Sequence, residues 1–384
     1  MKSIENIFLL LLCASIYEGE ADKEAKNLIT PEILPALFKL SKQHDLAHLV
    51  GDALQANGLL PDGSEAKKRF LEERGMAVYR YEQQQYEFEQ ICDVLQQSGV
   101  PFIPLKGALI RTLYPQPWMR TSCDIDFLVK EEDLPTAIHA LETTLHYQSG
   151  NKKSHDVSLF APSGVHLELH YKLNDGNQVW NGVLEKVWEY AKAEKVCCYA
   201  LTKEMFYFYH IAHMAEHFKC GGCGVRSFLD LFLLRKHTSY NQGTLARLLR
   251  QGGLTSFDEA VCALANYWFA DGEETALVLD LSDFILNAGM YGDVKNRVSI
   301  TKVKKGGSWK ALSSRIFLPY RLLKIQHPIV QKHKILVPFY QVKRWFHLLD
   351  KDRRQKSVRE LKMTVSEEKE TSERIAKLLD DLGI

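Results

Sequence analysis

The stretch "LKGALIRTLYPQPWMRTSCDIDFLV", residues 105–129, decides the fold of this chain. It ends in an apolar run, "DIDFLV", that has the length of a buried strand yet carries two aspartates. Side chains at positions i and i+2 of a strand share a face, so Asp124 and Asp126 point the same way and the apolar residues beside them face the core. Two converging carboxylates repel and raise each other's pKa, a penalty that a divalent cation between them removes. The run therefore suggests a metal-binding strand.

The residues before this strand have the pattern of a phosphate site. A short apolar strand, "VPFIPL" (100–105), leads into Lys106 and Gly107, where a helix is expected to begin. Gly107 lets a phosphate approach the backbone, and the N–H groups and dipole of the helix favour its charge. Lys106 and Arg120 would add positive charge suited to a triphosphate. We therefore expect a phosphate site that faces the metal site.

A third carboxylate follows on a later strand. Glu168 lies in "VHLELHYKL" (165–173), where alternation places it on the same face as His166, His170 and Lys172. A single glutamate on a strand is also common on a solvated face. If the strand pairs beside residues 124–129, Glu168 completes the metal site.

Composition gives broad limits. The chain has 384 residues and a formal net charge of +1, so its length suggests two or three domains and its overall charge indicates no particular partner. Eight cysteines, including the adjacent Cys197 and Cys198, are expected to be reduced thiols without disulfides, as in a cytoplasmic protein.

The N-terminal segment has two interpretations. Residues 7–14 form an apolar run like the core of a signal peptide, but Glu5 lies where a leader is basic and no Ala-x-Ala site follows before Glu18. The first core helix of a globular protein is the favoured interpretation. No apolar stretch reaches the about 20 residues of a membrane span.

The pattern along the chain predicts an α+β fold, with a small mixed β-sheet core flanked by N-terminal and C-terminal α-helical regions. Apolar residues recur at helical spacing over 4–97, and helices resume after the sheet until about residue 287. The expected strands are "VPFIPL", "DIDFLV", "HDVSLFAP" and "VHLELHYKL". The expected regions are 1–98 (helical), 99–201 (the sheet core), 202–290 (helices packing on the core) and 291–384 (basic and helical).

The final region carries an excess of positive charge. Residues 301–360 contain 16 lysines and arginines against three acidic residues, interleaved with aromatic residues. Such a segment could bind phosphate-rich partners, although a solvated basic face on packed helices is the favoured interpretation. Asp350 and Asp352 in this segment repeat the Asp-x-Asp spacing in a helical context, so we expect them to be exposed and to bind nothing.

A second group of potential metal ligands occurs in "HIAHMAEHFKCGGCG" (210–224). His213 and His217 lie at i and i+4 of a helix, and Cys220 and Cys223 follow in a turn, which together offer four ligands of the types that zinc prefers. A redox Cys-x-x-Cys and a plain glycine-rich helix end are the alternatives, and the helix end is favoured. His210, His213, Arg226 and Asp230 could instead line a nucleotide cleft or pair with one another.

The core resembles a known family. "GVPFIPLKGALIRTLYPQPWMRTSCDIDFLVKEEDLPTAIHALE" followed by "GVHLELHYKL" is similar to the uncharacterised nucleotidyltransferases of the polymerase-beta-like superfamily, whose pattern is Leu-Lys-Gly, Tyr-Pro, Arg, Asp-Ile-Asp and a later Glu-Leu-His. The resemblance implies a site for Mg²⁺ or Mn²⁺ at Asp124, Asp126 and Glu168, with Lys106, Gly107 and Arg120 at the nucleotide. In the wider superfamily the loop before the carboxylates usually reads Gly-Ser or Gly-Gly, where this chain has Lys106 and Gly107.

The resemblance implies transfer of a nucleoside monophosphate from ATP, CTP, GTP or UTP to a hydroxyl-bearing acceptor, with release of pyrophosphate. The acceptor would be a small molecule, a sugar or a protein, and His170, His213, His217, Arg226 and Asp230 are accessory candidates. A catalytically silent relative that binds nucleotide or a protein partner is the alternative; three intact carboxylates favour the enzyme. Nucleic-acid modification is the weaker possibility, because no template-binding module is recognisable.

Overall fold

The computed structural model describes residues 3–19, 23–173, 178–289, 300, 320, 323, 329–346 and 369–384. Most of the basic segment 301–360, including Asp350 and Asp352, lies outside these residues. What the sequence predicts for Asp350 and Asp352 is therefore neither supported nor contradicted by the fold.

The chain begins with a set of packed helices: α1 (Ile4–Ile16), α2 (Lys23–Leu28), α3 (Leu34–Gln43) and α4 (Ala47–Ala56). Ser3 begins α1, since its side chain accepts a hydrogen bond from the backbone N–H of Asn6. The apolar run 7–14 lies within α1, where Phe8, Leu11 and Leu12 are fully buried. Helix α1 packs against α3, α4 and α12 (Thr255–Phe269), as expected of a core helix.

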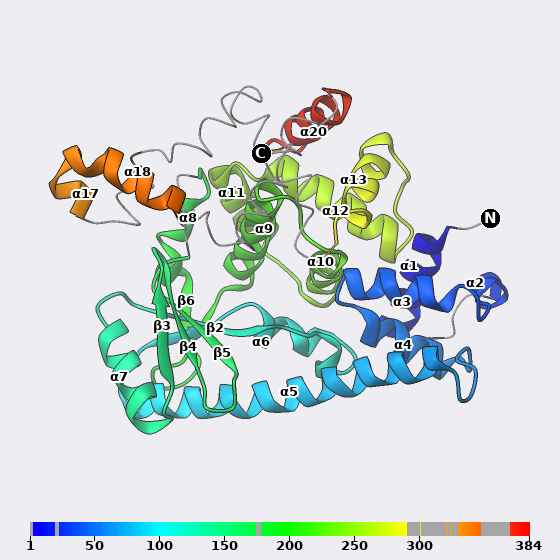
Figure 1. Cartoon of the computed structure of the whole chain (residues 1–384), viewed down its shortest axis with the longest axis horizontal. Helices are drawn as coiled ribbons and strands as arrows, with labels where there is room; N and C mark the ends of the chain where they lie inside the picture. The colour runs from blue at the N-terminus through cyan, green and yellow to red at the C-terminus, as the bar shows by residue number, and fades with distance from the viewer. Residues whose placement is uncertain are drawn as a thin grey trace.

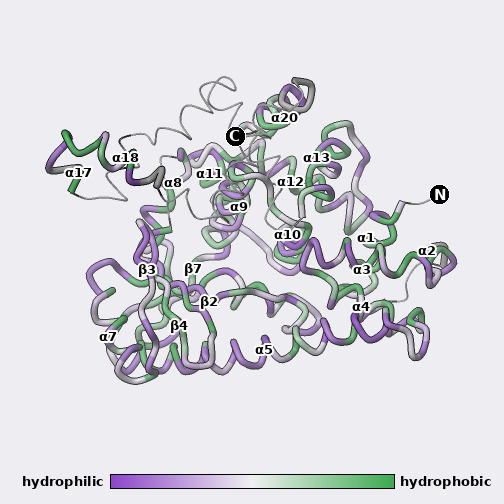
Figure 2. Tube along the Cα trace, in the orientation of Figure 1, coloured by the Kyte–Doolittle hydropathy of each residue, from purple (hydrophilic) through white to green (hydrophobic). Residues whose placement is uncertain are grey.

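One long helix, α5 (Glu65–Gln97), runs the length of this half of the molecule. Its 33 residues span about 50 Å. It packs against α4 near its start and α7 (Leu134–Thr144) near its end, so the N-terminal helices lie over one end and the sheet over the other (Figure 1). Figure 2 shows α5 coloured largely as hydrophilic, in keeping with its few buried residues. Gly99, with φ of +67°, follows the helix and turns the chain into the sheet.

The sheet has five strands in the order β1–β2–β5–β4–β3, and only the β2–β5 pair is parallel. The predicted α+β class and the mixed sheet are confirmed. The strands are β1 (Phe102–Pro104), β2 (Asp124–Val129), β3 (Gln148–Lys152), β4 (Asp156–Phe160) and β5 (His166–His170). The four expected strands are all present, and β3 is an additional edge strand. Its five residues, "QSGNK", are all exposed and polar, so they lack the apolar alternation that reveals a strand.

The two faces of the sheet differ in chemistry. One face carries Ile125, Phe127 and Leu167, which pack with α5 and α7 in a buried apolar cluster. The other face carries the polar residues of β2 and β5 and borders a cavity that is also lined by α9 (Lys203–Lys219). The alternation in "DIDFLV" is therefore that of a strand with one apolar face and one polar face.

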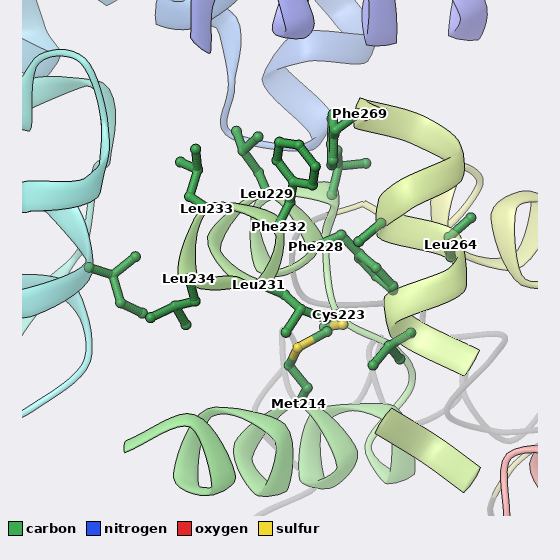
Figure 3. Packing of buried hydrophobic residues seen from close by; sticks show 14 of the residues in the cluster. Met214, Cys223, Phe228, Leu229, Leu231, Phe232, Leu233, Leu234, Leu264 and Phe269 are labelled. Carbon is green, nitrogen blue, oxygen red and sulfur yellow. The ribbon is translucent and has the colours of Figure 1, made fainter. Parts of the chain in front are cut away.

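Helices complete the described chain. The short helix α8 (Asn181–Leu184) is followed by a small hairpin of β6 (Ala191–Ala193) and β7 (Tyr199–Leu201). The helices after the hairpin are α9, α10 (Val225–His237), α11 (Gln242–Gly252), α12 and α13 (Ala276–Leu286). The last described helices are α17 (Ile329–Lys332), α18 (Val337–Phe346) and α20 (Lys369–Asp381). Figure 3 shows how α10 is held: Leu231 is directed toward Met214 of α9, and Phe228 toward α12. In the described residues, no helix combines the length and apolar character needed to cross a bilayer.

Candidate metal and nucleotide site

Three carboxylates meet on the polar face of the sheet. Asp124 and Asp126 both lie on β2, and Glu168 lies on the neighbouring parallel strand, directly beside Asp126 in the register. Asp126 is 4% exposed, whereas Asp124 is partly exposed. Alternation puts these side chains on one face of each strand, and parallel pairing of β2 with β5 then brings the two sets next to each other.

Two histidines extend this cluster. His166 and His170 flank Glu168 by two residues on either side along β5 and therefore share its face. In the described part of the chain, two sets of three side chains bring ligand atoms within 4.8 Å of one another: Asp124, His166 and Glu168 form the first set, and Asp126, Glu168 and His170 form the second. Both sets contain Glu168. This donor chemistry fits a divalent cation.

Lys106 occupies the centre of the cluster. Its Nζ donates to Oδ1 of Asp126 at 2.8 Å, and Nε2 of His170 lies at the same distance from the same oxygen. The backbone of Lys106 has φ of +42° and ψ of −113°, a conformation that residues other than glycine rarely adopt. The strained turn directs the lysine side chain back to the strand that carries Asp126.

The two aspartates consequently differ in charge behaviour. Burial raises the pKa of Asp124, and the negative charge of Asp126 raises it further. Burial also acts to raise the pKa of Asp126, but the ammonium of Lys106 and the hydrogen bond from His170 outweigh it, and the pKa falls well below its usual range. The pKa of Asp124 is therefore raised, as expected for neighbouring carboxylates, whereas at Asp126 the effects of Lys106 and His170 outweigh those that raise the pKa.

A fourth carboxylate, Asp156 of β4, lies beside His170 in the antiparallel register. It is fully buried, and Lys153 bridges it to Glu168: the lysine Nζ lies 2.9 Å from Oδ2 of Asp156 and 3.2 Å from Oε1 of Glu168. With Lys106 counted, four carboxylates face two ammonium groups, so two negative charges remain when all are ionised. One divalent cation would balance them.

Arg120 and Gly107 lie close together. A Cβ atom at position 107 would lie too close to Nη1 of Arg120, so a larger residue here would require the end of the arginine side chain to shift. Nη2 of Arg120 lies 2.9 Å from Oδ2 of Asp230, whose other oxygen accepts from the Tyr114 hydroxyl at 2.7 Å. The Arg120 side chain is 10% exposed and that of Asp230 is 3% exposed. Asp230 thus fixes Arg120 against the turn that carries Lys106.

Arg226 has a partner of its own. Its Nη1 donates to Oδ2 of Asp45 at 3.1 Å and to the backbone oxygen of Thr121 at 3.0 Å. These contacts tie α10 to the loop between α3 and α4 and to the segment before β2. Arg226 thereby supports the approach to the carboxylate strand.

The second ligand group, residues 213–223, is only partly assembled. His213 and His217 face each other with 3.2 Å between their Nε2 atoms. Burial lowers the pKa of His213 well below its usual value and that of His217 to about 4, so both rings are neutral at physiological pH. Cys220 is exposed, whereas Cys223 is buried and burial raises its pKa to about 12. Neither cysteine belongs to a three-ligand group among the described residues, and all eight cysteines are free thiols.

A cavity of about 370 Å³ joins the sheet to α9. Glu168 and His170 line its floor, Lys106 lies at one side, and Tyr209, His213 and His217 face it from α9. Trp180 provides an apolar wall. This volume lies in the range of about 300–1,000 Å³ that is usual for small-molecule sites. The cleft therefore combines Glu168 of the carboxylate cluster with aromatic and imidazole groups.

Sequence reasoning missed several of these residues. Trp180 and Tyr209 reach the cleft from segments far along the chain, and nothing in their local sequence marks them. Asp156 had a usable signal, since its place at the start of the strand "HDVSLFAP" becomes informative once that strand is paired antiparallel with the one carrying His170. The partner of Lys106 depends on a backbone conformation that the sequence does not announce.

A comparison with protein families gives a match over residues 33–270, more than half of the chain, to the family described as uncharacterised nucleotidyltransferase. The chain belongs to this family. The match runs from α3 to the end of α12 and includes all five strands and every residue of the carboxylate cluster. No curated protein and no solved structure matches the chain. The resemblance read from the motifs at 99–142 and 164–173 is thus confirmed at the level of the family.

Proposed function

We propose that this nucleotidyltransferase-family protein transfers a nucleoside monophosphate from a nucleoside triphosphate to a hydroxyl group of a small molecule, a sugar or a protein. The observation that carries the proposal is the convergence of Asp124, Asp126 and Glu168 on one face of the sheet, where Glu168 and Lys106 both line the cleft. Buried like charges of this kind are retained where they hold cations.

In this proposal Asp124, Asp126 and Glu168 hold Mg²⁺ or Mn²⁺. Bound divalent cations supply charge stabilisation for the triphosphate and lower the pKa of the attacking hydroxyl. Glu168 faces the cavity and is placed to accept the proton that this hydroxyl loses. The acceptor oxygen bonds to the α-phosphorus, the bond from that phosphorus to the bridging oxygen breaks, and pyrophosphate leaves.

Positive groups around the cleft would position the triphosphate. Lys106 lies next to the carboxylates, and Arg120 borders a smaller cavity of about 80 Å³ together with His213 and Arg226. Both groups are paired with a carboxylate, Lys106 with Asp126 and Arg120 with Asp230. Because Lys106 lines the larger cavity and Arg120 does not, we expect Lys106 to contribute more to triphosphate binding. Trp180 also lines the cleft, and the ammonium of Lys219 lies 4.3 Å from the centroid of its ring. We also propose a cytoplasmic location, because the free thiols suit a reducing compartment.

One observation favours the alternative of a catalytically silent nucleotide- or partner-binding protein. Lys106 already neutralises Asp126 at 2.8 Å, as an internal cation would in a site that holds no metal. A silent protein would keep this pair and bind nucleotide without any need for a metal. Metal dependence therefore separates the two candidates.

Thermal unfolding of the full chain with each of the four nucleoside triphosphates, with and without Mg²⁺ or Mn²⁺, tests the proposal. A ligand at 100 times its Kd stabilises the native state by about 2.7 kcal/mol. We expect one nucleotide to raise Tm only when metal is present, and that nucleotide to release pyrophosphate in the presence of the acceptor. Stabilisation without metal would support the silent protein, and no stabilisation by any nucleotide would contradict both.

A further inference from the structure

The two imidazoles beside Glu168 give the carboxylate cluster a composition that the motif alone does not imply. Along the register, Asp124 lies beside His166, and Asp126 lies beside Glu168. Each aspartate therefore has Glu168 and one histidine within reach, and the ligand atoms of each set lie within 4.8 Å. The histidines and the carboxylates come from the same two strands, so the sheet itself fixes their spacing.

The distances in the second set are those of ligands around one ion. Nε2 of His170 lies 2.8 Å from Oδ1 of Asp126 and 3.6 Å from Oε2 of Glu168. Two ligand atoms bonded to one cation at about 2.0–2.2 Å are separated by about 3–3.5 Å. A small shift of these side chains would place all three on a common metal.

Both rings also have a buried nitrogen that the described chain does not satisfy. Nε2 of His166 and Nδ1 of His170 are buried, and neither has a hydrogen-bond partner among the described residues. His170 as a whole is 5% exposed. A buried polar atom without a partner destabilises the native state by about 1–3 kcal/mol, and at His166 a bond from Nε2 to a metal would remove this penalty. At His170 the nitrogen that faces the carboxylates is instead Nε2, which lies 2.8 Å from Oδ1 of Asp126.

Aromatic contacts hold each ring in place. The Phe160 ring stacks on His166 with centroids 4.8 Å apart, and the His155 ring stacks on His170 at 6.0 Å. Both partners come from the β4 side of β5, opposite Asp124 and Asp126 of β2; Asp156 also lies on that side, beside His170. These ring contacts leave the side of each imidazole that faces β2 for a ligand.

We propose that His166 and His170 bind the divalent cation directly, so that an ion in either set has two carboxylate ligands and one imidazole ligand. This deepens the proposed function, since it concerns the same cluster. Mg²⁺ prefers oxygen ligands and retains water, whereas first-row transition ions bind imidazole more strongly. The site should thus select transition ions over Mg²⁺.

A competing role for His170 is to position Asp126 through the 2.8 Å contact without touching a metal. Such a positioning residue would leave an oxygen-only coordination shell and little preference between Mn²⁺ and Mg²⁺. The coordination shell itself must therefore be measured.

Mn²⁺ alone, added to the full chain, serves as the probe. Pulsed electron paramagnetic resonance detects ¹⁴N from an imidazole bound to Mn²⁺. We expect a ¹⁴N signal in the native protein, a weaker one in His166→Gln and in His170→Gln, and none in the double variant. His213→Gln, which alters an imidazole of the same cleft outside both sets, should keep the full signal. Oxygen-only coordination in the native protein would overturn the proposal, and that spectrum decides it even if the double variant fails to fold.

Affinity provides a second readout. We expect Mn²⁺ to bind the double variant at least about tenfold more weakly than the native protein, and the affinity for Mg²⁺ to change less. In the native protein, the Mg²⁺ concentration that half-fills the site should be at least about tenfold higher than the Mn²⁺ concentration that does so. Equal affinity of the native site for Mg²⁺ and Mn²⁺ would contradict the proposal. An imidazole-bound Mn²⁺ in a protein that transfers no nucleotide would refute the proposed function and leave this proposal standing. Metal-dependent nucleotide binding by a protein whose Mn²⁺ has only oxygen ligands would support the proposed function and refute imidazole coordination.

Discussion

The strand-borne ligands on the sheet and the helix-borne ligands at residues 213–223 look similar in the sequence but differ in the structure. On the sheet, two neighbouring strands with alternating side chains bring five potential ligands to one face. On α9, the i and i+4 spacing brings two histidines together, but the helix ends before the cysteines, and Cys220 is exposed while Cys223 is buried. The types of the potential ligands thus predict a metal site less well than the secondary structure that carries them and fixes their spacing.

The largest expected effect that separates the two groups comes from the aspartates. Asp124→Asn and Asp126→Asn should each reduce nucleotide transfer at least about a hundredfold, because each removes a negative ligand from the metal site. Pyrophosphate release with the nucleotide identified by thermal shift measures this. Nearly normal transfer by either variant would mean that the sheet cluster is not the catalytic site.

The same two variants should differ in stability when metal is absent. Asp126→Asn leaves the buried ammonium of Lys106 without its partner and should lower the free energy of unfolding by about 3 kcal/mol. Asp124→Asn removes a carboxylate whose charge is unfavourable, so its stability should stay equal or rise. Denaturant unfolding in a chelator compares them. Equal losses in both variants would contradict the distinct charge states assigned to the pair.

Acid should weaken metal binding at the sheet. The pKa of Asp124 is raised, so this ligand takes up a proton at a higher pH than an ordinary carboxyl group, and protons then compete with the metal. We expect the affinity for Mn²⁺ to fall as the pH decreases toward the raised pKa of Asp124. Below that pKa the affinity should fall about tenfold for each pH unit. The pKa of Asp126 is lower in the folded than in the unfolded protein, so this carboxylate stabilises the fold at pH values above its unfolded-state pKa. That stabilisation is lost as the pH falls through the folded-state pKa. Calorimetric titration over a pH series measures the metal effect, and an affinity that is constant down to pH 4 would contradict it.

Lys106 provides a smaller and more specific test. Lys106→Gly and Lys106→Ala remove the same charge, and both should weaken triphosphate binding about tenfold or more. They differ in the backbone, because glycine accepts the φ of +42° without strain. The glycine variant should therefore be more stable than the alanine variant by about 1 kcal/mol. Equal stability would show that the turn is not strained.

Whether a contact can be predicted from the sequence depends on how far apart its two residues lie in the chain. The face shared by Asp124 and Asp126 follows from strand geometry alone, and the sequence predicts it. The partnership of Lys106 with Asp126, and that of Arg120 with Asp230, joins residues 20 and 110 positions apart and depends on pairing and packing that no local pattern encodes. Asp156 becomes recognisable only once its strand is paired with the one that carries His170. Edge strand β3 was missed because its exposed polar residues give no alternation.

The smallest expected effects belong to the helix-borne group and to the C-terminal aspartates. Cys220→Ser should change stability by less than about 0.5 kcal/mol and leave metal content unaltered, because the side chain is exposed and outside both ligand sets. Asp350→Asn should change neither transfer nor stability. Elemental analysis and unfolding measure these outcomes. One tightly held zinc per chain that is lost in Cys220→Ser would make residues 213–223 a metal site after all.

The central claim is that the metal binds on the sheet, and anomalous X-ray scattering from crystals grown with Mn²⁺ tests it most directly. The expected result is a manganese peak within about 2.2 Å of ligand atoms from Glu168 and at least one of Asp124 and Asp126. The Asp126→Asn protein, crystallised in the same way, should show a weaker peak or none. A manganese peak between His213 and His217, with none at the carboxylates, would contradict the account.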